Sequence, residues 1–183
     1  MTLPIIGISG LPNSGKDTAA DYLVANYSYT KLSMAHRIRE TVYDIFDLDT
    51  ALMNDRTYES TPLPELGGKT VKVALQQLGK CCTDINSLVW VNAAFRHLDL
   101  TVPWVVADVR RPPEMDAIHK VGGICIYIHS NRPLPVDGRD MNHESESYHF
   151  YLMEHADYDL YNNDTLDWYY KSLDRLMDLI LRK

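Results

Sequence analysis

The sequence predicts an α/β fold with a mainly parallel sheet and helices on both of its faces. Short apolar runs alternate along the chain with amphipathic segments at helical spacing, a pattern typical of strand–helix–strand units. At 183 residues the chain is long enough for one domain, or for one domain with a small inserted lid. Its 45% hydrophobic and 23% charged residues are typical of a globular protein and exclude disorder as the main architecture.

The first half of the chain contains two predicted strands and four predicted helices. Residues 3–9 form a short Ile-rich run that ends in glycine, which indicates a buried strand. Residues 16–26 repeat their apolar positions at helical spacing. A second strand is predicted at 29–32, with helices at 35–46, 71–79 and 85–98. Residues 47–68 contain prolines and glycines but little periodicity, which predicts a long connection of a kind that tends to be functional.

The second half repeats the alternation. Residues 104–107 are an apolar run directly before Asp108, which predicts another buried strand. Two prolines suit the first turn of a helix over 112–121. Further strands are predicted at 124–129 and 158–161, and a C-terminal helix at 165–181 with Asn163 or Asp164 as its cap. The polar segment 130–147 is a candidate mobile loop. In folds of this class, ligands bind at the carboxyl ends of the strands.

Charge and cysteine content make several classes of partner and location poor candidates for this chain. The chain has 18 Lys and Arg against 25 Asp and Glu, a formal charge of −7, so it is a poor candidate for non-specific binding to nucleic acid or an anionic membrane. No apolar stretch approaches the ~20 residues of a membrane span, and no signal peptide is recognised. Cys81, Cys82 and Cys125 lack metal-site spacing and suggest reduced thiols, mostly in the core, of a cytoplasmic protein.

The strongest functional signal is the segment 10–18, Gly-Leu-Pro-Asn-Ser-Gly-Lys-Asp-Thr. Its spacing of glycines and lysine, between a predicted strand and a predicted helix, is that of a phosphate-binding P-loop. The glycines let backbone N–H groups point at phosphate oxygens, the helix N-terminus adds its dipole, and Lys16 brings a charge to the β- and γ-phosphates. The candidate nucleotide-binding residues are Gly10, Asn13, Ser14, Gly15, Lys16, Asp17 and Thr18.

The position after the lysine departs from the usual motif. Asp17 stands where a Ser or Thr hydroxyl normally ligates Mg²⁺, and Thr18 follows one residue later. Asp17 either holds the metal, directly or through water, or orients Lys16 or an acceptor group. Asp108 ends an apolar strand, as a Walker-B carboxylate does, although a turn-initiating Asp is the alternative. Asp17 and Asp108 are therefore the candidate ligands of Mg²⁺.

Five arginines are candidates for binding phosphate beyond the P-loop. Arg110 and Arg111 follow Asp108 at the carboxyl end of a predicted strand, where a guanidinium can bind phosphate bidentately. Arg37 lies near the start of a predicted helix, and Arg132 and Arg139 lie in the polar loop. A closing loop with arginines neutralises a phosphoryl group and excludes water. For each arginine alone, a solvated surface charge is the alternative.

Two other features favour a structural role. Asn142 to Glu146, with His143, fits no zinc motif, so a hydrogen-bonded loop anchor is preferred. The three tryptophans Trp90, Trp104 and Trp168 are expected mainly in the core, although each could stack on a base.

Short blocks along nearly the whole chain resemble the phage-type deoxynucleoside monophosphate (dNMP) kinases. They occur in family order and comprise the P-loop with its Asp17, Leu75 to Gly79, Trp90, Val106 to Arg110 with Glu114, Gly122 and Gly123, His143 to Glu146, and Ala156 to Asp164. The region 79–86 departs from the family because it has no arginine, only Lys80. This departure leaves the base specificity open.

The resemblance implies a three-layer P-loop kinase fold over 1–183, with a nucleoside monophosphate (NMP)-binding segment at about 34–98 and a lid at about 130–147. It implies transfer of the γ-phosphoryl group of ATP to a dNMP with Mg²⁺ as cofactor. The implied residues are Lys16, Arg110, Arg132 and Arg139 for catalysis, and Arg37, Gln76, Trp90, Asp108, Arg110 and Arg111 for the acceptor nucleotide.

Other functions remain open at this point. One is a P-loop kinase for another small acceptor, of the dephospho-CoA or phosphomevalonate type. Another is a non-catalytic nucleotide-binding module, although the paired arginines argue for an acceptor site. Neither nucleic acid nor a membrane is an expected partner, and the apolar C-terminal helix is compatible with a homodimer.

Overall fold

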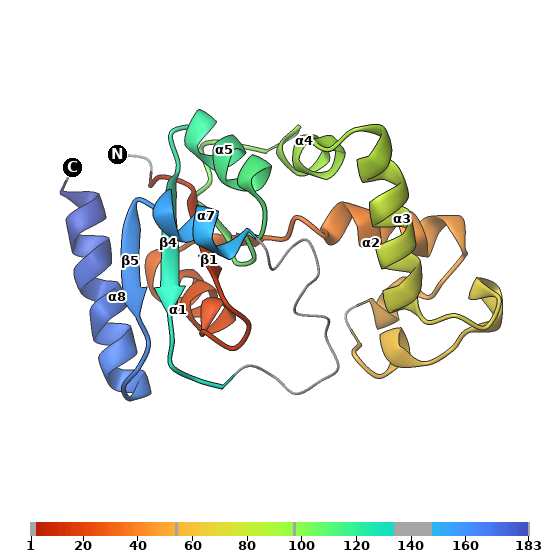
Figure 1. The fold of residues 1–183 in the computed structure, drawn as a ribbon, viewed down its shortest axis with the longest axis horizontal. Coiled ribbons are helices and arrows are strands. Elements are labelled where there is room, and N and C mark those ends of the chain that lie inside the picture. Colours follow the sequence, from red (N-terminus) through yellow and green to blue (C-terminus); the bar gives the residue numbers. More distant parts are fainter. Residues whose placement is uncertain (1–2, 54, 97, 134–147, 183) are drawn as a thin grey trace. The chain divides into compact units, whose positions relative to one another are not determined.

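The structure, a computed structural model, describes residues 3–53, 55–96, 98–133 and 148–182 (Figure 1). The chain divides into two compact units, which are described separately. Unit 1 comprises Met1–Ser33 and Asp99–Lys183, and unit 2 comprises Met34–Leu98. Among the helices that the structure describes, none has both the length and the apolar character needed to span a bilayer.

Unit 1 is built on a five-stranded sheet in which every neighbouring pair of strands is parallel. The strand order is β2-β3-β1-β4-β5. The strands are β1 (Ile6–Gly10), β2 (Thr30–Leu32), β3 (Trp104–Val106), β4 (Ile124–His129) and β5 (Tyr158–Tyr161). The α/β fold with a parallel sheet that the sequence predicts is therefore present, with β1 at its centre.

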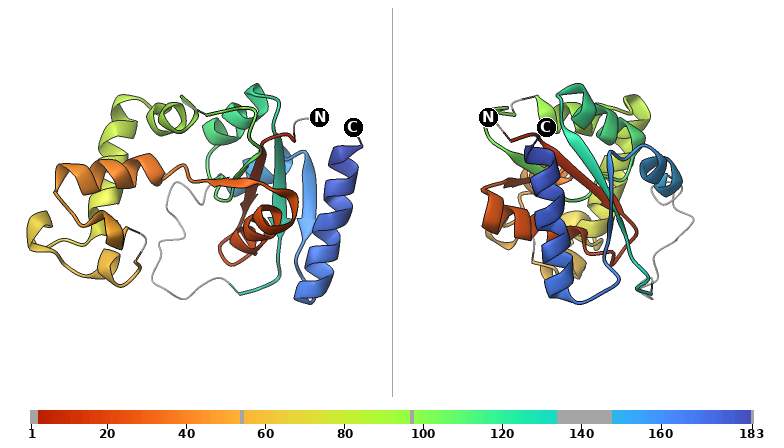
Figure 2. Two further views of the ribbon diagram at one scale, coloured as in Figure 1. Left: turned by 180° about the vertical axis from the view of Figure 1, so that it is seen from behind. Right: turned by 90° about the vertical axis from the view of Figure 1, so that its left-hand side faces the viewer.

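Helices cover both faces of this sheet (Figure 2). They are α1 (Lys16–Tyr27), α5 (Pro112–Lys120), α7 (His149–Glu154) and α8 (Leu166–Leu181). On the side of α1 and α8, Ile6 and Ile8 of β1 pack in a core with Leu23 and Leu173, and both isoleucines are fully buried. Burying each such side chain contributes roughly 1.5–3 kcal/mol. The helix α5 packs against β1 and β4 and also contacts α7.

Unit 2 is helical. It contains α2 (His36–Ile45), α3 (Val71–Ile85) and α4 (Val89–Phe95), with short 3-10 helices at Thr50–Leu52, Tyr58–Ser60 and Pro64–Leu66. Its core consists of Val42, Tyr43, Leu48, Leu63, Leu66, Val71 and Ala74. The Nε of Arg39 donates to the carboxylate of Glu59 at 2.9 Å, and Glu59 is only 3% exposed. Three core leucines therefore come from the segment 47–68, which the sequence indicated only as a connection.

Three expectations about helices are wrong. The helix predicted over 85–98 is only α4, Val89–Phe95, because α3 ends at Ile85 and the Asn86 side chain accepts from the N–H of Leu88 in the turn between the two helices. The helix predicted over 71–79 continues through Gly79 to Ile85, because nothing at that glycine interrupts it and its carbonyl accepts hydrogen bonds from Thr83 and from the Trp90 indole. The cap of α8 is Thr165, whose hydroxyl accepts from the backbone N–H of Trp168, and not Asn163 or Asp164. The helix α7 was not predicted at all, since its six residues are too few for a clear periodicity.

Three expectations about burial also need correction. Of the cysteines only Cys125 is buried, whereas Cys81 is exposed on the outer side of α3. None of the three tryptophans is buried, and Trp168 is 49% exposed. The apolar face of α8 is buried in unit 1 through Tyr169, Leu173, Leu176, Met177 and Ile180. That face therefore belongs to the core, whereas Leu166, Trp168, Leu179 and Leu181 of the same helix are exposed, and the homodimer stays a prediction.

Candidate active site

The P-loop joins the carboxyl end of β1 to the start of α1, and two of its positions require glycine. Gly10 has a φ of +145°, and a Cβ there would lie 2.6 Å from the carbonyl oxygen of Ile128 in β4. Gly15 has a φ of +101°, and a Cβ there would collide with the side-chain amide of Asn162. Asn13 also has a positive φ, of 63°. The backbone thus makes the tight turn that a phosphate cradle needs.

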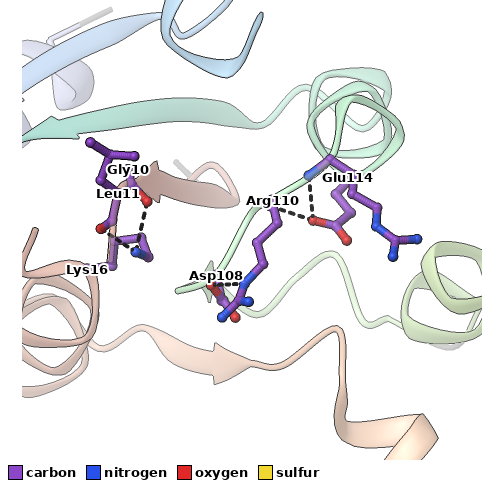
Figure 3. Close-up of polar contacts among 7 residues, drawn as sticks. Gly10, Leu11, Lys16, Asp108, Arg110 and Glu114 are labelled. Carbon is purple, nitrogen blue, oxygen red and sulfur yellow. Dashed lines mark hydrogen bonds and ion pairs between the residues drawn. The ribbon is translucent and has the colours of Figure 1, made fainter. Parts of the chain in front are cut away.

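Lys16 curls back over this turn. Its Nζ donates to the carbonyl oxygens of Gly10 and Leu11, both at 2.9 Å (Figure 3). Lys16 is also the first residue of α1, where the N–H groups of the opening turn have no partner within the helix. The ammonium group and the helix N-terminus therefore meet at one place that is suited to an anion.

A cavity of about 530 Å³ opens beside the P-loop. Its lining residues are Asn13, Gly15, Lys16, Asp17, Thr18, Arg132 and Pro133. The structure thus brings Arg132, from the start of the polar loop, to the same cavity as Lys16. Two cations and a helix N-terminus in one cavity are chemically suited to phosphate groups. Arg139 and the segment 142–146 lie outside the described residues.

Two residues that were not among the predicted site residues donate hydrogen bonds to carbonyl groups of the P-loop. The amide nitrogen of Asn162 donates to the carbonyl oxygen of Ser14 at 2.8 Å, and the hydroxyl of Tyr169 donates to that of Gly15 at 3.1 Å. Burial raises the pKa of Tyr169, so its hydroxyl stays a donor at neutral pH. The only signal in the sequence was the family block from Ala156 to Asp164, which contains Asn162 but does not indicate its partner.

Two buried oxygen atoms beside these contacts lack a hydrogen-bond partner among the described residues. They are the hydroxyl of Ser14 and the side-chain carbonyl of Asn162. Both residues are almost fully buried, at 1% and 2% exposure. An unsatisfied buried polar group is costly, and such groups concentrate at sites with a function. This observation fits a loop that is shaped for a ligand.

Asp17 and Asp108, the candidate metal ligands, are each paired with a cation. Asp17 accepts from Lys31 at 3.1 Å and its side chain is 82% exposed. Asp108 accepts from the Nε of Arg110 at 2.7 Å, and both side chains are about half exposed (Figure 3). Exposed pairs of this kind are weak, so either carboxylate can exchange its partner for another cation. Carboxylate oxygens are ligands that Mg²⁺ accepts.

The segment after β3 is held firmly by its backbone. The N–H of Val109 donates to the carbonyl of Ile8 at 3.0 Å, which keeps the segment beside the end of β1. The Glu114 carboxylate accepts from the N–H groups of Arg110 and Arg111 at 2.7 and 3.2 Å. Burial raises the pKa of Glu114, although these two N–H groups oppose the shift. Asp108 and Arg110 are thus presented at the sheet edge that carries the P-loop.

The remaining predicted residues belong to unit 2. Arg37 lines a separate cavity of about 600 Å³. The other lining residues are His36, Glu40, Thr41, Asp44, Thr50 and Met53. Gln76 is exposed on α3, and neither it nor Trp90 lines this cavity. Trp90 is half-buried and uses its indole nitrogen to tie α4 to the Gly79 carbonyl of α3.

One mixed group of potential metal ligands lies elsewhere in the described part of unit 1. His119, Cys125 and Asp157 meet at the amino ends of β4 and β5, at the opposite edge from the P-loop. Asp157 accepts from the N–H of Cys125 at 2.7 Å and contacts His119 Nε2 at 2.9 Å. Burial raises the pKa of the Cys125 thiol to about 12, which disfavours the thiolate that would bind a metal. These contacts explain the group as a structural link between α5, β4 and β5.

The sequence and the structure were compared with those of known proteins. No family model matches the sequence. A protein of Acanthamoeba polyphaga mimivirus, provisionally described as a deoxynucleotide monophosphate kinase, is 26% identical over 190 residues, which span 95% of this chain and 96% of the viral protein.

Solved structures add the architecture. Shikimate kinase from Acinetobacter baumannii, in complex with shikimate, aligns with a TM-score of 0.51 and 17% identity over 99% of this chain and 94% of its own. A dephospho-CoA kinase from Campylobacter jejuni aligns at a TM-score of 0.47 with 12% identity over 96% of each chain, too distant to support an argument. The chain thus shares its α/β fold with the shikimate kinase, with the segment 10–18 at the carboxyl end of the central strand β1.

Proposed function

We propose that this protein transfers the γ-phosphoryl group of ATP to a deoxynucleoside 5′-monophosphate, giving ADP and the deoxynucleoside diphosphate. The observation that carries the proposal is the P-loop cavity, in which Lys16 and Arg132 converge on the N-terminus of α1. The mimivirus relative, similar over 95% of the chain, supports this choice of reaction. The proposed family is that of the dNMP kinases.

The donor half of the reaction is assigned to unit 1. The turn formed by Gly10, Ser14 and Gly15 suits phosphate groups. It has glycine at the two positions where a side chain would collide, so the backbone N–H groups can approach phosphate oxygens closely. Lys16 exchanges its two carbonyl contacts for phosphate oxygens when ATP binds. The oxygen donors Asp17 and Asp108 suit a hard cation and would hold Mg²⁺, which neutralises phosphate charge.

The acceptor half needs few chemical groups. The attacking atom is a phosphate oxygen of the dNMP, which is already anionic, so no strong general base is required. That oxygen forms a bond to the γ-phosphorus while the bond to the β–γ bridging oxygen breaks, and the electron pair leaves with ADP. The proposed acceptor residues are Asp108, Arg110 and Arg111 in unit 1, and Arg37, Gln76 and Trp90 in unit 2. Unit 2 is the proposed NMP-binding segment.

Closure is assigned to the proposed lid at about 130–147. Arg132, at its start, is proposed to neutralise the transferring phosphoryl group together with Arg139. Phosphoryl transfer depends mainly on positioning and charge neutralisation, so these arginines and Lys16 are expected to supply most of the rate.

The test is ADP release from Mg-ATP with each dNMP and each ribonucleotide monophosphate offered singly at one concentration. We expect release that depends on one or a few dNMPs, which also identifies the base. Dephospho-CoA and phosphomevalonate in the same panel report on other acceptors. Binding of ATP without release in the presence of any dNMP would overturn the proposal. Omission of Mg²⁺ is expected to abolish the release.

A further inference from the structure

Asn162, the residue directly after β5, contacts both the P-loop and the segment that follows β4. The side chain of Asn162 donates to the Ser14 carbonyl at 2.8 Å and fills the space that a Cβ on Gly15 would need. Asn162 is 2% exposed. Since Ser14 O can only accept, the amide nitrogen must face it, which fixes the orientation of the amide.

The backbone of the same residue holds the end of β4. The N–H of Asn162 donates to the carbonyl of His129 at 2.8 Å, and its carbonyl accepts from the Ser130 hydroxyl at 3.3 Å. The neighbouring Asn163 accepts from the N–H of Asn131 at 2.8 Å. The Ser130 hydroxyl in turn accepts from the N–H of Arg132 at 3.2 Å. A chain of hydrogen bonds therefore runs from the P-loop, through Asn162, to the backbone of Arg132.

We propose that Asn162 is a positioning residue that sets the P-loop and the Arg132 segment relative to each other, so that Lys16 and Arg132 act on the same phosphates. The inference rests on the proposed function and assigns the residue that prepares its donor site. Asn162 holds the Ser14 carbonyl by a hydrogen bond, and Tyr169 holds the Gly15 carbonyl in the same way. The N–H groups of the loop are then left to face the ligand.

The proposed role requires an asparagine at position 162. An aspartate has the same shape but cannot donate, so it would place a carboxylate against the Ser14 carbonyl and near the phosphates. An alanine removes the donor and opens the space beside Gly15. Neither variant touches the backbone bonds to β4, so the effect on the P-loop can be separated from the folding of the strand.

The experiment measures ADP binding by calorimetry for wild type, Asn162→Asp and Asn162→Ala, together with KM for ATP, KM for the accepted dNMP and Tm. Asn162→Asp is expected to weaken ADP binding at least tenfold and to raise KM for ATP, while KM for the dNMP stays within twofold. Asn162→Ala is expected to show a smaller loss in the same direction and serves if the aspartate variant does not fold. Asn26→Ala, an exposed asparagine on α1, is the matched control and is expected to bind ADP like wild type.

The second arm uses Tyr169→Phe, which removes only the hydroxyl on Gly15. We expect its effect on ADP affinity to be non-additive with that of Asn162→Ala, because both bonds hold the same turn. A fall in Tm with unchanged ADP affinity in the folded variants would mean that Asn162 is only structural, and would overturn the inference. Wild-type binding of ADP without turnover of any dNMP overturns the proposed function but leaves this inference testable by binding alone.

Discussion

The P-loop of unit 1 and the candidate acceptor residue Arg37 of unit 2 are held by opposite kinds of contact. In unit 1 the P-loop is fixed by buried bonds from distant parts of the chain, such as the Asn162–Ser14 contact across 148 residues. In unit 2 Arg37 pairs with Glu40, three residues further along α2, and both side chains are at least 40% exposed. The tertiary fold organises the candidate phosphate site of unit 1, whereas local, solvated contacts hold the candidate acceptor residue of unit 2.

This difference has an energetic meaning. A buried hydrogen bond that loses its donor leaves an unsatisfied group and costs about 1–3 kcal/mol, whereas an exposed ion pair contributes about 0–1 kcal/mol. The phosphate cradle is therefore prepared before a ligand arrives, and the arginine of unit 2 can leave its partner at little cost. Changes at the cradle should affect turnover strongly, and changes at the exposed arginine should affect acceptor affinity.

The largest expected effect is that of Lys16→Ala. Removal of the ammonium group is expected to lower kcat by roughly 10²–10³-fold, the size of effect that follows the loss of one group stabilising charge in a transition state. Tm should stay near the wild-type value, because the ammonium group bonds to the Gly10 and Leu11 carbonyls at the cavity, where water can replace it. Lys120→Ala on α5 is the control. Wild-type turnover in Lys16→Ala would overturn the role of this lysine.

Gly15→Ala tests the prebuilt cradle. A side chain in the left-handed region costs about 1–2 kcal/mol, and the collision with Asn162 adds to it. Gly122→Ala is the matched control, since Gly122 has a φ of +76° but nothing within 4 Å of a Cβ. We expect the larger fall in Tm, and loss of ADP binding, only at Gly15. Equal effects of the two substitutions would contradict the steric argument.

Arg37→Ala tests the exposed candidate acceptor residue of unit 2. We expect KM for the accepted dNMP to rise about tenfold, as the loss of one charge-assisted bond predicts, with KM for ATP unchanged. Arg56→Ala, an exposed arginine of the same unit, is the control. Steady-state kinetics with each substrate varied in turn gives both constants. An unchanged KM for the dNMP would remove Arg37 from the acceptor site.

The smallest effect is expected from Glu114→Gln, which affects the segment carrying Asp108 and Arg110. Because burial raises the pKa of Glu114 in the folded state above its ordinary value of 4.5, folding favours its protonated form. Its contribution to stability is present below the ordinary pKa and is lost as the pH rises through the raised one. The stability of Glu114→Gln relative to wild type should therefore increase from pH 4 to pH 7. Urea unfolding at both values measures the difference, and the opposite trend would refute the assignment.

The P-loop and the parallel sheet were predictable because their signals are local. Nine consecutive residues contain the glycines and the lysine of the cradle, and the three central strands β1, β3 and β4 are short apolar runs. The structure of the segment 47–68 and the helix α7 could not be predicted in this way. Leu48, Leu63 and Leu66 lie in a core without any regular spacing, and six residues of α7 give no clear period.

The sequence by itself determined the chemistry of the proposed donor site, since Gly10, Gly15 and Lys16 contribute through their own backbone freedom and charge. Only the tertiary structure decided what holds that site: Asn162 on Ser14, Tyr169 on Gly15, and Arg132 in the same cavity. The physical reason is that a hydrogen bond or a shared cavity depends on which residues the folded sheet brings together. No local pattern in Asn162 or Tyr169 specifies a partner that lies about 150 residues earlier in the chain.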